Sequence, residues 1–314
     1  MTAGSGGVRG SVLDPASLQA EVLAELSWVL IVGATLVFLV TMGLAAWALR
    51  QRGKPAVASA WWIGGAGIAF PVAVLSALLI YSTWRTRGLE LPPDGDPLVV
   101  GVTGHLWWWE VRYRDPASGR EIALANELHL PAGRPVQLGL AAADVIHSVW
   151  MPSLGGKMDL VPGRLNRLVI TAREPGRYRG QCAEYCGEQH ARMALWVVVH
   201  TPADYERWLQ GQLRPAGLSS DPLLQRGRQA FREQGCVACH TVRGHGEGGR
   251  RGPDLTHVGS RLTLGAGVLE MGPGAMAAWI TGVQALKPGA HMASFRHLDA
   301  PTLQALSAYL AELR

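Results

Sequence analysis

Hydrophobic positions divide this chain into parts with different periodicities. The first part holds two long apolar runs, residues 26–49 and 56–84, which carry no charged residue and can each cross a bilayer as a helix. Pro71 lies inside the second run, and we expect it to kink that helix. Residues 26–85 are therefore predicted to form a transmembrane helix hairpin.

The pattern changes near residue 98, where short β-prone stretches begin to alternate with turn residues. These stretches are residues 98–102, 106–113, 127–130, 136–140, 167–170 and 195–199. Glycine and proline separate them, as in Pro131-Ala132-Gly133 and Pro175-Gly176. This spacing is typical of a small antiparallel sandwich or barrel.

Helix signals dominate the remainder of the chain. Thr201-Pro202 and Asp221-Pro222 each place a capping side chain before a proline at the first helical turn. After Asp299 and Pro301, leucines recur on one helical face: Leu303, Leu306, Leu310 and Leu313. Residues 214–220 are interpreted as a linker, and residues 221–314 as a small all-α domain.

Charge gives the hairpin an orientation. The cationic segment Arg50-Gln51-Arg52-Gly53-Lys54 separates the two apolar runs, and the positive-inside rule places it in the cytoplasm with both flanking ends outside. Residues 1–25 lack the basic n-region of a signal peptide, so we expect no cleaved leader. They are interpreted as an N-terminal periplasmic segment.

Composition narrows the function further. The chain is 48% hydrophobic and 17% charged, which is a low charged content for a wholly soluble protein. Its net charge of +5 is spread along the sequence, which argues against a nucleic-acid partner. The cysteines form two close pairs, Cys182/Cys186 and Cys236/Cys239, and such spacing indicates metal or cofactor chemistry more than a disulfide framework.

The first cysteine pair belongs to a set of soft ligands. Cys182, Cys186, His190 and Met193 lie close together in the sequence, and His147 lies upstream. A mixed sulfur and nitrogen set favours copper over hard cations, and a second cysteine would allow two sulfurs to bridge two copper ions. A Cys182–Cys186 disulfide and a zinc site are the alternatives, although Met193 is a poor zinc ligand.

The second pair belongs to Cys236-Val237-Ala238-Cys239-His240, the C-x-x-C-H attachment sequence for c-type haem. Both thiols would bond to the haem and His240 would be the proximal iron ligand. We expect Met292, after Lys287-Pro288-Gly289, to be the sixth ligand, because a thioether suits an electron carrier. The competing ligands are Met271, Met276, His291 and His297.

Other residues of this part are given lesser roles. Trp279 is expected either to donate its indole N–H to a haem propionate or to pack in the core. Asp254, His245 and His257 are expected to be solvated loop residues.

These motifs resemble a known family. The segment containing Cys182 and Cys186 resembles the binuclear CuA motif of cytochrome c oxidase subunit II, and Gly104-His105-Leu106-Trp107-Trp108-Trp109 resembles that family's aromatic segment. Residues 221–314 are similar to small bacterial cytochromes c, which gives a caa3-type fusion. The resemblance implies a multidomain membrane protein: a transmembrane helix hairpin (26–85), an all-β cupredoxin-like Greek-key CuA domain (86–213), the linker (214–220) and an all-α class I cytochrome c domain (221–314).

The resemblance also implies roles for single residues. Cys182 and Cys186 would bridge the coppers, and His147 and His190 would each complete one of them. Met193 would be one weak axial ligand and the backbone carbonyl of Glu184 the other. The Glu184 side chain would reach a magnesium ion at the boundary with the catalytic subunit. Trp107 would be the electron-entry aromatic residue that faces the donor.

One departure from the family concerns proton uptake. Members often carry a glutamate before the proline of the second helix, and the corresponding position here is Gly64. We therefore expect proton uptake by that route to be absent or to use another residue.

The function implied is that of the electron-entry subunit of a haem-copper terminal oxidase. Electrons would pass from cytochrome c through a covalent haem c and the binuclear copper centre to the subunit that reduces O2 to water, so no catalytic residue is expected in this chain. The implied partners are oxidase subunits I and III, a cytochrome c donor and membrane lipid. Because haem is attached outside the cytoplasm, both domains and both termini would face the periplasmic side of a bacterial inner membrane. The alternatives are the CuA-bearing small subunit of a nitric-oxide reductase and a membrane-tethered copper redox carrier.

Overall fold

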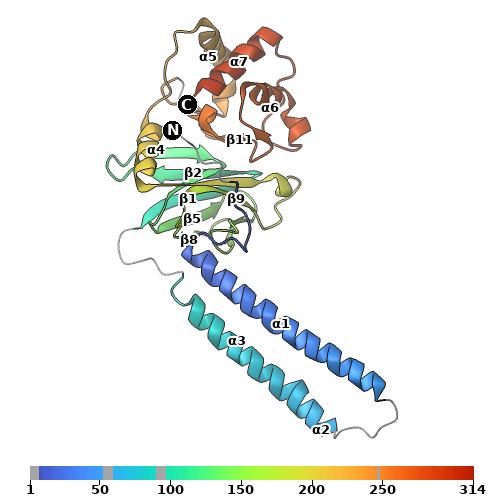
Figure 1. Cartoon of the computed structure of the whole chain (residues 1–314). Coiled ribbons are helices and arrows are strands. Elements are labelled where there is room, and N and C mark those ends of the chain that lie inside the picture. Colours follow the sequence, from blue (N-terminus) through green and yellow to red (C-terminus); the bar gives the residue numbers. More distant parts are fainter. Residues whose placement is uncertain (1–6, 52–58, 90–96, 246–247) are drawn as a thin grey trace.

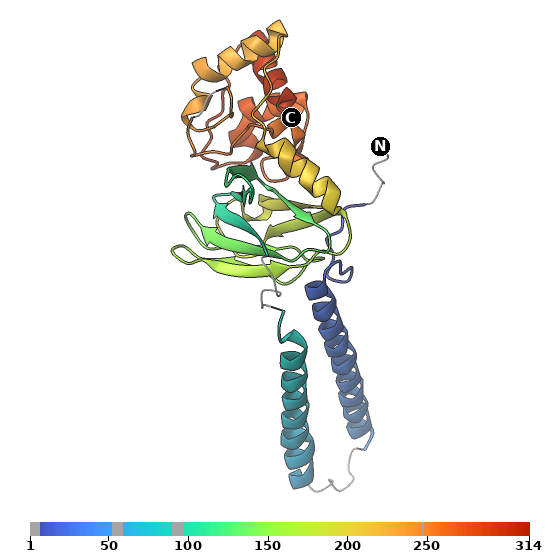
Figure 2. The same cartoon turned by 90° about the vertical axis from the view of Figure 1, so that its left-hand side faces the viewer.

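The computed structural model describes residues 7–51, 59–89, 97–245 and 248–314. A pair of long helices, a β-sandwich and a helical C-terminal domain follow one another along the molecule (Figure 1). The sandwich lies between the helix pair and the C-terminal domain in both views (Figure 2).

The hairpin consists of α1 (Leu18–Arg50) and a second helix in three stretches. These are α2 (Ser59–Trp61), the π-helical η1 (Trp62–Ala69) and α3 (Phe70–Thr86). Both helices are long and apolar enough to cross a membrane. The change from π- to α-helix occurs next to Pro71, whose missing N–H cannot bond to the preceding turn. Of the cationic segment, Arg52 and Lys54 lie outside the described residues.

Helix α1 begins well before its apolar run and extends from the hairpin onto the sandwich. Ser17 caps its first turn by accepting a hydrogen bond from the Ala20 N–H. Gln19, Ala20 and Val22 are buried there, and Gln19 accepts a hydrogen bond from the Thr171 N–H at 3.1 Å. The start of α1 is therefore part of the sandwich domain's packing.

The sandwich has two five-stranded sheets. In sheet order the first contains β3 (Glu121–Ala125), β2 (Trp108–Arg114), β1 (Leu98–His105), β5 (Val136–Ala142) and β8 (Asn166–Ile170). The second contains β4 (Glu127–Pro131), β10 (Ala194–His200), β9 (Gly176–Cys182), β6 (His147–Trp150) and β7 (Met158–Leu160). Large apolar side chains such as Trp109, Tyr113 and Leu138 fill the core between the sheets.

The sheets are mixed, so the expectation of a purely antiparallel arrangement is wrong. β1 pairs with β5 in parallel, and so does β4 with β10. In each case the chain visits other strands between the two partners, which supplies the long connection that parallel neighbours need.

The C-terminal domain is built from α5 (Pro222–Glu233), α6 (Pro273–Leu286) and α7 (Ala300–Glu312), and α4 (Pro202–Leu213) leads into it from the sandwich. Short elements connect them: η3 (Cys236–Ala238), η4 (Val258–Ser260), β11 (Thr263–Leu264) and β12 (Leu269–Glu270). Gly227 allows α5 and α7 to cross closely, since a Cβ there would lie 2.1 Å from the Ala305 carbonyl oxygen.

Two expectations about this domain are wrong. His245 and His257 are buried rather than solvated. The His245 Nδ1 lies 2.9 Å from the Tyr309 hydroxyl, and the His257 Nε2 lies 3.0 Å from the Arg214 carbonyl oxygen. Both rings therefore fill hydrogen-bonded positions inside the fold, and His257 ties the segment after α4 to the domain.

Candidate functional site

The five copper-ligand candidates converge at one end of the second sheet. His147 opens β6 and Cys182 closes β9, and these strands pair. Residues 183–193, the copper-site loop, then return to β10, which pairs with β9 from Ala194 onward. The Cys182 N–H donates to the Met193 carbonyl oxygen at 3.0 Å, which closes the loop.

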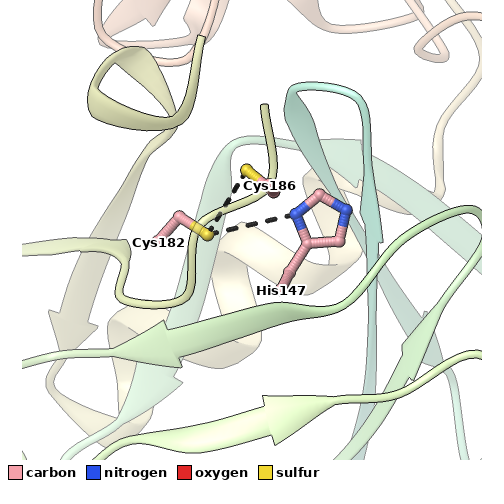
Figure 3. A group of neighbouring side chains, drawn as sticks. All are labelled: His147, Cys182 and Cys186. Atoms are coloured by element: carbon pink, nitrogen blue, oxygen red, sulfur yellow. Dashed lines mark hydrogen bonds between the residues drawn. The ribbon is translucent and has the colours of Figure 1, made fainter. Parts of the chain in front are cut away.

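The side chains of this group form a chain of close contacts, of which Figure 3 shows His147, Cys182 and Cys186. The two cysteine Sγ atoms are 3.8 Å apart, with the His147 Nδ1 3.9 Å from Cys182 and the His190 Nδ1 3.7 Å from Cys186. The Met193 Sδ lies 3.9 Å from the Cys186 Sγ. Both cysteines are free thiols, so the alternative disulfide is not formed.

Glu184 contributes its main chain to this group and directs its side chain elsewhere. The Glu184 carbonyl oxygen lies 3.2 Å from the Cys182 Sγ. The carboxylate is 45% exposed and lies 3.8 Å from the Lys157 ammonium group. In the part of the chain that the structure describes, this carboxylate joins no cluster of three metal-binding side chains.

The thiols strongly perturb each other's titration. The Cys186 thiol lowers the pKa of Cys182 well below its usual range, and the His147 ring adds to this effect. The Cys182 thiolate in turn raises the pKa of Cys186. The metal-free pair thus holds one proton between two sulfurs, and bound cations would displace it.

Two neighbours that sequence reasoning missed orient His147. The Asp144 Oδ1 lies 2.8 Å from the His147 Nε2, which leaves Nδ1 facing the sulfurs. Burial alone would lower the pKa of His147, but the Cys182 and Asp144 charges raise it. Gly104 of β1 lies against the ring, since a Cβ there would be 2.7 Å from the His147 Cδ2. Gly104 stood in the aromatic segment already recognised, and Asp144 lies three residues before His147, which was the available signal.

The donor set fits a pair of copper ions. The His147 ring and the Glu184 carbonyl lie beside the Cys182 sulfur. The His190 ring and the Met193 thioether lie beside the Cys186 sulfur. A single tetrahedral zinc ion would instead draw both imidazoles and both thiols around one point. Soft sulfur donors with imidazole are the ligands that copper prefers.

Trp107 lies between the copper-site loop and the C-terminal domain. Its indole Nε1 donates to the Cys186 carbonyl oxygen at 2.8 Å, and the residue is 9% exposed. A Cβ on Gly187 or on Gly289 would lie 3.2 Å from its ring. The indole is thus held between a glycine of the loop and a glycine of the C-terminal domain.

The haem-attachment segment forms the short η3 and the turn that follows it. Cys236 is half-buried and Cys239 is exposed, and both are free thiols. The His240 Nδ1 lies 2.8 Å from the Pro253 carbonyl oxygen, which leaves Nε2 available to a metal. Burial lowers the pKa of His240, so the neutral form that ligates iron is favoured. These residues fit covalent haem with a histidine ligand.

The candidates for the sixth iron ligand differ in their surroundings. Met292 is half-buried, and its carbonyl oxygen accepts a hydrogen bond from the Gln284 amide at 2.7 Å. Met276 is buried in the core and Met271 packs against it, whereas His291 and His297 are exposed. Trp279 also packs against this core.

Comparisons with known proteins agree with these motifs. The family described as cytochrome c oxidase subunit II, periplasmic domain, matches residues 115–201, and the cytochrome c family matches residues 224–314. Cytochrome c oxidase subunit 2 of Alkalihalophilus pseudofirmus is 34% identical over 255 residues, which are 79% of this chain and 72% of that protein. The Bacillus subtilis protein of the same name is 33% identical over 229 residues, 70% of this chain and 63% of that protein.

A solved structure is also similar. The periplasmic domain of cytochrome oxidase subunit II from Bradyrhizobium japonicum is 30% identical, with a TM-score of 0.35, and the match covers 38% of this chain and 95% of that one. The two family matches, the pair of long apolar helices and the two-sheet sandwich confirm the expected fold class: two apolar helices, a cupredoxin-like β-sandwich and a helical cytochrome c domain.

Proposed function

The chain belongs to the cytochrome c oxidase subunit II family, and we propose that it is the electron-entry subunit of a haem-copper terminal oxidase. Electrons would reach it from cytochrome c and pass, by way of a covalent haem c and a binuclear copper centre, to the subunit that reduces O2 to water. The observation that carries this proposal is the pairing of two thiols 3.8 Å apart with one imidazole at each sulfur.

The copper-site residues would hold the metal and limit its rearrangement. Cys182, Cys186, His147, His190, Met193 and the Glu184 carbonyl would together hold a pair of copper ions. Bound copper would supply reversible one-electron chemistry. Burial of His147, Cys182, Cys186 and Met193 keeps water away, and the Asp144 carboxylate fixes one imidazole.

The cytochrome c domain would hold the second cofactor. Cys236 and Cys239 would hold haem covalently, His240 would present its free Nε2 to iron, and Met292 would be the other iron ligand. Trp107 would connect the two sites, because it touches Gly289 on one side and hydrogen-bonds to Cys186 on the other. Its burial under the cytochrome c domain supports this domain, rather than a separate cytochrome, as the immediate donor.

Glu184 is the residue of this chain that would face a magnesium ion at the subunit boundary. Glu184 offers one carboxylate, which the Lys157 ammonium group approaches to 3.8 Å. A hard cation needs several oxygen ligands, so most of them would have to come from the catalytic subunit. We propose only that Glu184 faces that boundary, and we assign magnesium no part in electron transfer.

The surroundings of the protein follow from the same family. The chain is anchored in a membrane through α1 and the α2–α3 helix and associates with an oxidase complex that includes subunit I. We further propose that both termini and both domains face the periplasmic side of a bacterial inner membrane, with subunit III, membrane lipid and a cytochrome c donor as the other partners.

The test is to exchange one cysteine of each pair in the detergent-solubilised full chain. Cys186→Ser should abolish the electron-spin signal shared over two coppers and leave covalent haem unchanged, because a hydroxyl is a poor bridging ligand. Cys239→Ser, the matched control in the other pair, should leave the copper signal and weaken haem attachment. A copper signal that survived Cys186→Ser would contradict the ligand assignment.

A further inference from the structure

Lys287 is a cation buried at a boundary between domains. The lysines of the chain are Lys54, Lys157 and Lys287, and the side chain of Lys157 is 54% exposed whereas Lys287 as a residue is 3% exposed. It follows α6 directly and opens the turn that contains Gly289 and leads to Met292.

The ammonium group of Lys287 joins three separate segments through main-chain carbonyl oxygens. Its Nζ donates to Trp107 at 2.8 Å, to Arg192 at 2.8 Å and to Gly265 at 2.7 Å. The first two acceptors belong to the sandwich: one is the main-chain carbonyl of Trp107 itself, and the other lies on the copper-site loop. The third belongs to the cytochrome c domain.

The contacts around Lys287 form a continuous seam. The Arg192 guanidinium donates to the Leu286 carbonyl oxygen at 2.8 Å. The Ala194 N–H donates to the Ala266 carbonyl oxygen at 3.1 Å, and the Leu262 N–H donates to the Glu127 carboxylate at 2.5 Å. Lys287 lies where this seam meets the indole of Trp107.

We propose that Lys287 is a positioning residue, a latch that holds the cytochrome c domain on Trp107 and reserves this tryptophan for the fused domain. The proposal rests on the proposed function for what passes through Trp107, but the latch itself rests on the three carbonyl contacts. Lysine suits the task because its three N–H donors match three acceptors, and no other side chain offers three donors from one atom.

The chemistry of burial supports a dedicated role. Burial lowers the pKa of Lys287 to about 7, so the fold holds this cation at a cost that an apolar residue would not incur. Removing the donor would also leave three carbonyl groups without their partner in a closed interface. Such an arrangement stabilises one docked geometry rather than general adhesion between the domains.

The first experiment labels amines in the wild-type full chain and compares Lys157 with Lys287 by peptide mass spectrometry. Lys157 is the internal reference because it is exposed. We expect Lys287 to react at least about tenfold more slowly while the chain is folded, and as fast as Lys157 after denaturation. Equal rates in the folded chain would overturn the latch.

The second experiment follows docking in Lys287→Met, with Lys157→Met as the matched control. Hydrogen exchange is measured at the Ala194 and Leu262 amides, whose acceptors lie across the domain boundary. We expect about tenfold loss of protection in Lys287→Met alone, with slower transfer from haem to copper and unchanged haem content. Wild-type protection in Lys287→Met would refute the proposal, and the labelling result stands even if this variant folds poorly.

Failure of the latch and failure of the proposed function give different results. If the wild-type chain lacked copper or haem, the electron-entry role would fail, yet labelling and exchange would still report on the latch. If both cofactors were present and Lys287 labelled freely, only the latch would fail.

Discussion

At the scale of single residues, the proposed copper site depends on the absence of a side chain as much as on its proposed ligands. Gly104 lets the His147 ring lie directly against β1, and Asp144 fixes the opposite nitrogen. The imidazole is thereby confined between a strand and a carboxylate. Small changes behind the ring should act on the metal without touching a ligand.

Gly104→Ala tests this dependence. The added Cβ would lie 2.7 Å from the His147 Cδ2, so the ring must shift and copper retention should fall by about tenfold or more. Gly101→Ala on the same strand is the control, because its Cβ would meet only Arg112 at 3.7 Å and beyond. Copper content after dialysis against a chelator measures the effect, and equal retention by the two variants would show that the ring has room to move.

The sequence predicted the ligand types but not their orientation. Thiols, imidazoles and a thioether are rare enough in combination that their spacing indicated copper. Asp144, Gly104 and Lys287 are common residue types whose roles depend on which strand or loop lies opposite. Those neighbours come from segments distant in the chain, and their identity follows only from the folded topology.

At the scale of elements, the strands with alternating apolar residues were the predictable ones. All six predicted β stretches coincide with strands of the sandwich, whereas β3, β6, β7 and β9 of the sandwich and the two-residue strands β11 and β12 were missed. β9 reads Gly-Arg-Tyr-Arg-Gly-Gln-Cys, so only its inward residues Tyr178, Gly180 and Cys182 are buried. Only Tyr178 among these inward residues is large and apolar, so the period of two is hard to detect in the sequence of β9.

The attachment of α4 to the sandwich creates a pH dependence. Trp208 of α4 stacks on His129, with their ring centroids 4.2 Å apart. The His129 Nδ1 lies 2.8 Å from the His200 Nε2. Burial and then the nearby His129 lower the pKa of His200 to about 4, and Asp204 opposes them weakly. His200 therefore binds a proton less readily in the folded chain than in the unfolded chain.

Protonation of His200 should make the stability of the folded chain depend on pH. Between the ordinary value of 6.5 and about 4 the unfolded state binds more protons, so stability should fall as the pH drops through this window and level off below it. We expect about 2 kcal/mol of loss between about pH 7.5 and about pH 5. Thermal unfolding of the wild-type chain and of His200→Gln measures it. The variant should have a shallower pH slope, whereas His291→Gln at an exposed position should keep the wild-type slope.

At the scale of the whole molecule, two domains meet at one indole. Gly187 and Gly289 both adopt positive φ angles and both approach the Trp107 ring. The three-part order of the chain could be predicted from its motifs. This contact could not, because neither glycine has a pattern that distinguishes it from an ordinary turn residue.

Gly289→Ala should disturb the contact between Trp107 and the C-terminal domain in addition to straining its own backbone. Its φ of 76° strains any side chain, and the new Cβ would lie 3.2 Å from Trp107 and 3.1 Å from Glu188. Gly119→Ala has a similar φ of 68° with nothing within 4 Å, so it controls for strain of about 1 kcal/mol. Quenching of tryptophan fluorescence by an added solute should rise for Gly289→Ala only. Identical quenching in both variants would show that the domains adapt without separating.

Helix α1 has a mechanical consequence for the assembled protein. One uninterrupted helix runs from the hairpin into the packing of the sandwich. The sandwich, which carries the copper-site residues, should therefore move together with α1 as one rigid unit. Each residue of an α-helix advances the chain by about 1.5 Å along the helix axis and turns it by about 100° around that axis. The number of residues between Ser17 and the apolar run therefore sets both the distance and the direction of the sandwich relative to the hairpin.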